Sequence, residues 1–197
     1  MRKILLLLRA ENTSKENSNY VKAIKQFGGE VICLLDSATK EEAANKMKDV
    51  FGILLPGGSE VGRLDFFIIE YALKNNIRLF GICQGMQSMA LYNTDNKLVE
   101  IGNMSHQQKD RYIHKVFLEK SHFRDIVGKS VIEVNSHHIQ TVLDSRMFNI
   151  VGKSEDGLIE VIENGHHVFQ IGVQWHPELM LDYDSTSRIL FEAFFKE

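Results

Sequence analysis

The chain has 197 residues, of which 44% are hydrophobic and 25% are charged, and it contains only two prolines. This composition predicts one domain spanning residues 1–197 around one core, rather than two cores joined by a linker. The net charge of −3, with both signs mixed along the sequence, excludes the basic surface of a protein that binds nucleic acid.

Neither a membrane segment nor a disulfide framework is expected. The apolar run at residues 4–8 is too short to span a membrane, and no cleavable leader follows it, so we expect a cytoplasmic protein. The two cysteines, Cys33 and Cys83, suit a reducing compartment. Cys33 lies in an apolar run and is expected in the core.

In the first half of the chain, helical patterns alternate with apolar runs typical of buried parallel strands, at residues 3–8, 31–35, 51–55 and 79–82. Apolar residues at helical spacing predict three helices, with these faces: Tyr20, Ile24 and Phe27; Phe66, Ile69 and Leu73; and Met86, Met89 and Ala90. Residues 39–42 fit a capping box that starts another helix. The polar residues 11–19 are expected to form a loop bordering the pocket.

In the second half, strands are expected at residues 131–134, 158–162 and 168–174, some of them in a small antiparallel extension. A terminal helix carries Leu190 and Phe194 on one face. The polar residues 93–114 are expected to be irregular and near the site. The whole pattern predicts an α/β fold with a three-layer, doubly wound, mostly parallel sheet of the flavodoxin-like type. In such a fold the loops at the carboxyl ends of the strands meet around the site.

Cys83 lies where an apolar strand at residues 78–82 meets a helical pattern at residues 84–92. Gly81 and Gly85 flank it, and small residues on both sides permit the tight backbone of a nucleophile elbow. The N-terminus of the following helix favours the thiolate over the thiol. The sequence therefore predicts cysteine-based catalysis, with a buried structural cysteine as the alternative.

His176 and Glu178 follow the strand-like run at residues 168–173. Residues two apart in extended backbone point to the same side, so this imidazole and carboxylate can meet while Pro177 restricts the chain between them. A cysteine nucleophile needs an imidazole to accept its proton, and that imidazole needs a carboxylate to fix its tautomer. The pair is therefore predicted to serve Cys83.

The sequence Leu-Pro-Gly-Gly at residues 55–58 ends a strand in a turn that exposes backbone amides. The N–H groups of Gly58 and Gln84 can then form an oxyanion hole, although an ordinary loop is the alternative.

No metal or other cofactor is expected. The adjacent histidines His137–His138 and His166–His167 lack the cysteine or carboxylate spacing of a known metal site. The charged stretch at residues 109–111 is expected to be solvated.

Three motifs in this order resemble the class I glutamine amidotransferase superfamily: Leu-Pro-Gly-Gly (55–58), Gly-x-Cys-x-Gly-x-Gln (81–87) and Gln-Trp-His-Pro-Glu (174–178). The similarity spans nearly the whole chain, so the fold of that superfamily is implied. The resemblance also implies a catalytic triad, two oxyanion donors and two residues at the glutamyl group: Cys83, His176 and Glu178; Gly58 and Gln84; and Gly57 and Gln87.

Further pieces resemble the γ-glutamyl hydrolase branch, which is peptidase C26-like: residues 19–24 with 28–29, 114–116, 134–140 and 156–160. The branch implies hydrolysis of a γ-glutamyl amide bond in a small-molecule substrate, through a glutamyl thioester. In relatives, backbone around the Asn-Ser-x-His segment helps to bind the α-amino and α-carboxylate end of the substrate. This implies substrate-binding roles for Ser136 and His137.

The sequence departs from that branch after the Pro-Gly-Gly turn. Relatives usually have a long segment there, whereas residues 59–62 lead directly into the helical residues 63–67. A shorter wall over the pocket suits a larger leaving group. The chain also resembles hydrolases that release a nucleotide phosphoramidate from a γ-glutamyl conjugate during capsule modification.

Two other functions fit the same motifs. One is a glutaminase subunit that passes ammonia to a synthase partner, although a partner is not required. The other is a non-catalytic sensor or chaperone in which Cys83 is oxidised rather than acylated.

Overall fold

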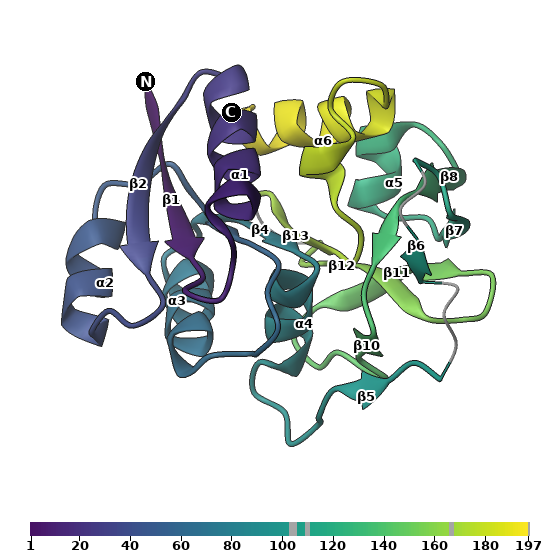
Figure 1. Cartoon of the computed structure of the whole chain (residues 1–197), viewed down its shortest axis with the longest axis horizontal. Coiled ribbons are helices and arrows are strands. Elements are labelled where there is room, and N and C mark those ends of the chain that lie inside the picture. The colour runs from purple at the N-terminus through teal and green to yellow at the C-terminus, as the bar shows by residue number, and fades with distance from the viewer. Residues whose placement is uncertain (103–105, 109–110, 166–167, 197) are drawn as a thin grey trace.

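Five parallel strands form the half of the sheet that positions the site. The computed structural model describes residues 1–102, 106–108, 111–165 and 168–196, and in these ranges the strand order of the main sheet is β2-β1-β3-β4-β13-β12-β11-β7-β8 (Figure 1). The parallel strands are β2 (Gly29–Leu35), β1 (Arg2–Leu8), β3 (Gly52–Leu55), β4 (Arg78–Ile82) and β13 (Gln170–Val173). Every residue of β3 and β13 is buried, as is usual for central parallel strands.

The sheet continues beyond β13 as an antiparallel extension. Its strands are β12 (Ile159–Glu163), β11 (Asn149–Ser154), β7 (His114–Leu118) and β8 (Val131–Val134). Two short pairs lie beside it, β5 (Val99–Glu100) with β10 (Gln140–Thr141) and β6 (Gln107–Gln108) with β9 (Ser136–His137). The expected antiparallel extension is thus confirmed.

Helices cover both faces of the sheet and complete the three layers (Figure 1). Side chains alternate along each strand, so Ile4 and Leu6 pack on one face while Leu5 and Leu7 pack on the other. The first face is covered by α1 (Ser14–Gln26), α5 (His122–Val127) and α6 (Ser185–Phe195). The second is covered by α2 (Lys40–Met47), α3 (Arg63–Lys74) and α4 (Gln84–Leu91). The predicted doubly wound α/β architecture is confirmed.

The polar stretch at residues 11–19 is not a loop throughout, because α1 begins at Ser14. Thr13 Oγ1 accepts a hydrogen bond from the backbone N–H of Glu16, and the N–H of Thr13 donates to the Glu16 carboxylate. This reciprocal capping box starts the helix in a polar sequence. A capping box is also expected at Thr39. Thr39 caps α2 by accepting a hydrogen bond from the N–H of Glu42, but the Glu42 carboxylate forms an ion pair with Lys46, one turn further along the helix.

Two other expectations need correction. The buried face of α3 carries Leu64, Ile68 and Ile69. The expected face is therefore rotated around the helix axis, because two of its residues, Phe66 and Leu73, are only half-buried. Cys33 is exposed rather than in the core, because β2 is the edge strand of the sheet.

The polar segment at residues 93–114 is partly outside the described residues, as are Lys109 and Asp110 and the pair His166–His167. Its described parts include β5, β6 and the first residue of β7. Among the helices in the described ranges, none combines the length and the apolar character that crossing a bilayer requires.

Candidate active site

Cys83 sits on a strained turn between β4 and α4. Its backbone has φ 52° and ψ −109°, a region that residues with a side chain rarely adopt. The turn is tight because a Cβ on Gly85 would lie 2.1 Å from the carbonyl oxygen of Leu55, and a Cβ on Gly81 would lie 2.5 Å from Met89 Sδ. Both glycines are therefore required for β4, α4 and β3 to approach this closely, which gives the nucleophile elbow that the sequence predicts.

The backbone and side chain of Cys83 are both anchored to β13 and the residue after it. Its N–H donates to the carbonyl oxygen of Val173 (2.8 Å), and Gln174 Nε2 donates to Cys83 Sγ (3.6 Å). The sulfur also lies at the N-terminus of α4, where unpaired backbone N–H groups favour negative charge. Only 6% of the surface of Cys83 is exposed, and the residue lines a cavity.

His176 and Glu178 lie side by side, with 2.8 Å between His176 Nδ1 and Glu178 Oε1. The backbone there is not extended as expected, because the 3₁₀ turn η1 (Pro177–Leu179) begins directly after His176. The helical turn, and not an extended backbone, brings the imidazole and the carboxylate together. Burial lowers the pKa of His176, but the charges of Glu178 and Cys83 outweigh burial and raise this pKa well above its ordinary value.

Cys83 and His176 face the same space across Gly57. A Cβ on Gly57 would lie 2.9 Å from His176 Cε1, 3.0 Å from Tyr20 Oη and 3.4 Å from Cys83 Cβ. The two side chains therefore flank a gap that only a glycine leaves open. The N–H of Gly57 donates to Tyr20 Oη, and Asn12 Nδ2 donates to the carbonyl oxygen of Gly57, which fixes the turn.

Gly58 lies beside the side chain of Gln84. A Cβ on Gly58 would lie 2.7 Å from Gln84 Oε1, and neither the backbone N–H of Gly58 nor that of Gln84 donates a hydrogen bond to any group in the described part of the chain. Free N–H groups at the ends of two neighbouring parallel strands are suited to hold a developing oxyanion if they point to the same place.

The other predicted substrate-binding residues differ in position. His137 lines the cavity, with its ring centre 5.7 Å from that of His176. Gln87 contacts the cavity residue Cys83 only through Gln174. Its Nε2 donates to Gln174 Oε1 (3.1 Å) and to the carbonyl oxygen of Gln140 (2.9 Å). Ser136 is fully buried, and its hydroxyl lies 3.2 Å from His106 Nδ1, away from the cavity.

The cavity at this site has a volume of about 800 Å³. Cys83, His137, His176 and Glu178 form its inner part, and its mouth is lined by α1 and the loops after β1 and β3, including these residues: Glu11, Asn12, Thr13, Lys15, Glu16 and Ser59. The expectation that residues 11–19 border the pocket therefore holds, although residues 14–19 are helical.

Sequence reasoning missed Tyr20, Asn135 and Gln174 as residues of the site. Tyr20 fits the apolar face of α1, which hides its contact 3.5 Å from His176 Nδ1. Burial, and then the charges of Glu178 and Cys83, raise the pKa of Tyr20 well above its ordinary value, so the hydroxyl keeps its proton. Asn135 and Gln174 are each close in sequence to a predicted site residue. Only the fold shows that Asn135 hydrogen-bonds His176 and that Gln174 hydrogen-bonds Cys83.

Solved structures with this fold include glutamine amidotransferases. The glutaminase domain of Trypanosoma brucei CTPS with bound acivicin has a TM-score of 0.77 at 16% identity, covering 100% of this chain and 95% of that one. A glutamine amidotransferase from Thermotoga maritima has a TM-score of 0.67 at 16% identity, covering 98% and 90%. These likenesses agree with the strand order and layers described above.

Curated relatives match over most of both sequences. The γ-glutamyl-γ-aminobutyrate hydrolase PuuD of Escherichia coli is 28% identical, over 95% of this chain and 87% of its own length. Protein NtpR of Enterococcus hirae is also 28% identical, over 97% and 95%. The profile of the Peptidase C26 family matches residues 62–178, which is more than half of the chain and includes both Cys83 and His176. The chain belongs to the Peptidase C26 family.

Proposed function

We propose that this chain is a cysteine-dependent hydrolase that cleaves γ-glutamyl amide bonds and releases glutamate and an amine. The observation that carries the proposal is the strained Cys83 facing, across Gly57, an imidazole held by a carboxylate. A hydrolase acting on C–N bonds is also what the family and the relative PuuD, a γ-glutamyl-γ-aminobutyrate hydrolase, support.

In the proposed mechanism, the Cys83 thiolate attacks the γ-carbonyl carbon and the C–N bond breaks after His176 protonates the leaving nitrogen. The N–H groups of Gly58 and Gln84 stabilise the oxyanion in both tetrahedral steps. His176, now neutral, takes a proton from water, which attacks the glutamyl thioester and frees Cys83. Glu178 keeps the imidazole aligned throughout.

Substrate recognition is proposed for four residues. Gly57 leaves room for the glutamyl chain, since any side chain there would meet His176. His137 lines the cavity directly. Gln87 acts by holding Gln174 against Cys83, and Ser136 acts through its backbone, since its hydroxyl faces His106.

The leaving group enters from the mouth of the cavity. The loop at residues 59–62 is short and leads directly into α3, so it covers little of the cavity mouth on that side. This suits a leaving group larger than ammonia. Two carboxylates, those of Glu11 and Glu16, stand there with one lysine, Lys15. This excess of negative charge favours a leaving group that is an amine without phosphate groups. A nucleotide phosphoramidate is the competing candidate for the leaving group.

The test is mass spectrometry of products from wild type, Cys83→Ala and Cys33→Ala. The substrates are glutamine, γ-glutamyl-γ-aminobutyrate, a γ-glutamyl polyamine and a γ-glutamyl-nucleotide phosphoramidate. We expect glutamate release by wild type and by the exposed-cysteine control Cys33→Ala, and none by Cys83→Ala. Activity retained in Cys83→Ala would rule out the mechanism. Release from glutamine alone, dependent on an added synthase, would favour a glutaminase subunit.

A further inference from the structure

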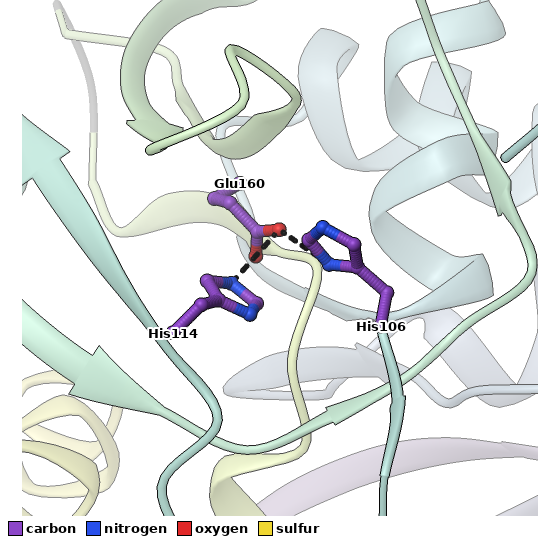
Figure 2. A group of neighbouring side chains, drawn as sticks. All are labelled: His106, His114 and Glu160. Carbon is purple, nitrogen blue, oxygen red and sulfur yellow. Dashed lines mark ion pairs between the residues drawn. The ribbon is translucent and has the colours of Figure 1, made fainter. Parts of the chain in front are cut away.

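A second group of ionisable side chains lies buried beside the active site, and the proposed reaction does not use it. Its members come from four separate segments: His106 next to β6, His114 at the start of β7, His138 after β9, and Glu160 in β12. Figure 2 shows His106 and His114 approaching Glu160 from two different segments. Glu160 is fully buried, and His106 and His138 are 2% and 4% exposed.

The side chains converge on one carboxylate oxygen. Glu160 Oε1 lies 3.2 Å from His114 Nε2, 3.6 Å from His138 Nε2 and 3.9 Å from His106 Nδ1. In a tetrahedral zinc site with bonds of 2.0–2.1 Å, neighbouring ligand atoms are about 3.4 Å apart. The three separations from Glu160 Oε1 lie on both sides of this value. Ligand atoms of His106, His114 and Glu160 all lie within 4.8 Å of one another, and His138 joins this group through its contact with Glu160.

The contacts of His114 and His138 with Glu160 are charged contacts whose geometry is poor for hydrogen bonds. His114 Nε2, His138 Nε2 and both oxygens of Glu160 are buried without a hydrogen-bond partner in the described part of the chain. Leaving a buried polar atom unpaired is unfavourable, and more so for a charged group. Several such atoms aimed at one point therefore indicate a ligand that binds all of them at once.

For two of the three histidines an outer contact decides which nitrogen faces the centre, whereas His114 Nδ1 is buried without a hydrogen-bond partner in the described residues. His138 Nδ1 lies 3.0 Å from the carbonyl oxygen of Gln140, which only accepts, so Nδ1 carries the proton and Nε2 faces Glu160. His106 Nε2 lies 3.0 Å from Asp156 Oδ2, so its Nδ1 faces Glu160 and the Ser136 hydroxyl. Nitrogen lone pairs aimed at a carboxylate repel it unless a proton or a metal ion lies between them. Carbonyl or carboxylate partners on the outer nitrogen are also what metal-binding histidines have.

We propose that His106, His114, His138 and Glu160 bind one Zn²⁺ in a closed, four-coordinate structural site. Three imidazole nitrogens and one carboxylate oxygen suit zinc, and four protein ligands leave no position for a substrate. The charges balance, because Zn²⁺ is offset by Glu160 and by Asp156 behind His106. The metal would replace the Ser136 hydroxyl as the partner of His106 Nδ1.

The site ties the segment at residues 135–140 to the sheet. That segment carries His137 of the cavity, and the carbonyl oxygen of Gln140 accepts from both His138 Nδ1 and Gln87 Nε2. This departs from the expectation of no metal, which rested on adjacent histidines. The four ligands are far apart in sequence, so no short motif reveals them, and of the adjacent pairs only His138 takes part.

The test measures zinc in untagged protein by elemental mass spectrometry, in wild type, Cys83→Ala, Glu160→Gln and the exposed-histidine control His122→Gln. We expect one zinc per chain in wild type, Cys83→Ala and His122→Gln, and its loss in Glu160→Gln. Chelation should lower the Tm of wild type, and Zn²⁺ but not Mg²⁺ should restore it. Zinc that disappears in Cys83→Ala would place the metal at the active site and overturn the proposal.

A spectroscopic measurement keeps the test decisive if Glu160→Gln does not fold. Cys83→Ala is stripped with a chelator and loaded with Co²⁺, whose visible bands report tetrahedral coordination. We expect such bands at one equivalent, and their loss when Zn²⁺ is added. If no Co²⁺ bands form, or if wild type binds no zinc and gains no Tm from it, the cluster is an ion pair held by a proton and the proposal fails.

Discussion

Asn135 and His176 hold one another by two hydrogen bonds that run in opposite directions. Asn135 Nδ2 donates to the carbonyl oxygen of His176 (2.9 Å), and the N–H of His176 donates to Asn135 Oδ1 (2.8 Å). This clamp fixes the backbone from which the imidazole projects, at the point where β13 ends and the turn η1 begins. The direction of the imidazole thus depends on a residue 41 positions upstream.

Replacing Asn135 should therefore impair chemistry more than binding. Asn135→Ala removes both bonds and frees the His176 backbone, and displacement of a catalytic group by about 1 Å costs on the order of 100-fold in rate. We expect kcat to fall by about that factor with KM little changed, as measured by steady-state kinetics on the preferred γ-glutamyl amide. Asn45→Ala, at an exposed asparagine on α2, is the control. Wild-type kcat in Asn135→Ala would show that the clamp is dispensable.

Gly57 should tolerate no side chain in an active enzyme. The Cβ of Gly57→Ala would lie 2.9 Å from His176 Cε1, so the ring must turn away from Cys83 or the alanine must block the gap between them. We expect loss of nearly all turnover, with retained secondary structure in circular dichroism. Gly102→Ala, where a Cβ has open space, serves as the control and should keep full activity. Equal activity of both variants would show that the gap at Gly57 is not used.

The parallel half of the sheet could be predicted because its strands are short, apolar and buried on both faces. Runs such as residues 79–82 have no other stable environment, and their order along the chain places Gly58 and Cys83 at the same edge. The antiparallel half is harder to recognise, since β11 has only three buried residues and mixes them with polar ones. Its pairing with β12 and β7 depends on distant partners that no local pattern reveals.

The candidate site divides in the same way. The positions of Cys83 and Gly58 after strand ends could be predicted because glycines next to a strand end impose a specific backbone. The contact of His176 with Glu178 was predicted from an extended backbone, yet the 3₁₀ turn produces it. Tyr20 and Asn135 could not be identified, because their roles arise from contacts with residues more than 40 positions away or across the sheet, and a local sequence pattern carries no information on such contacts.

The pH dependence of stability should report the environment of His176. Its folded-state pKa is raised above the ordinary 6.5, so the ion pair stabilises the fold fully below pH 6.5 and loses this effect as the pH rises through the folded value. Glu178→Gln removes the strongest cause that raises the pKa. We therefore expect the His176 resonance of this variant to titrate at lower pH in NMR, and the alkaline loss of stability in urea unfolding to shrink. Cys33→Ser should leave both curves unchanged, and an unshifted titration in Glu178→Gln would contradict this account.

A buried ion pair beneath the Gly58 turn should contribute most to stability among the charged contacts of α3. Arg9 and Asp65, 2% and 0% exposed, form a two-bond pair, with Arg9 Nη1 2.8 Å from Asp65 Oδ2. Asp65 also accepts from the N–H of Gly62 and from Ser88 Oγ, so it joins β1, α3 and α4. Asp65→Asn leaves a buried guanidinium without its counter-charge, which costs about 3–5 kcal/mol. Glu70→Gln, which breaks the exposed pair with Lys74 on the same helix, should not change the free energy of unfolding measurably. The free energies of unfolding of the two variants are measured in urea. Similar unfolding midpoints for Asp65→Asn and Glu70→Gln would mean that water reaches Arg9 and that the buried pair does not stabilise the turn.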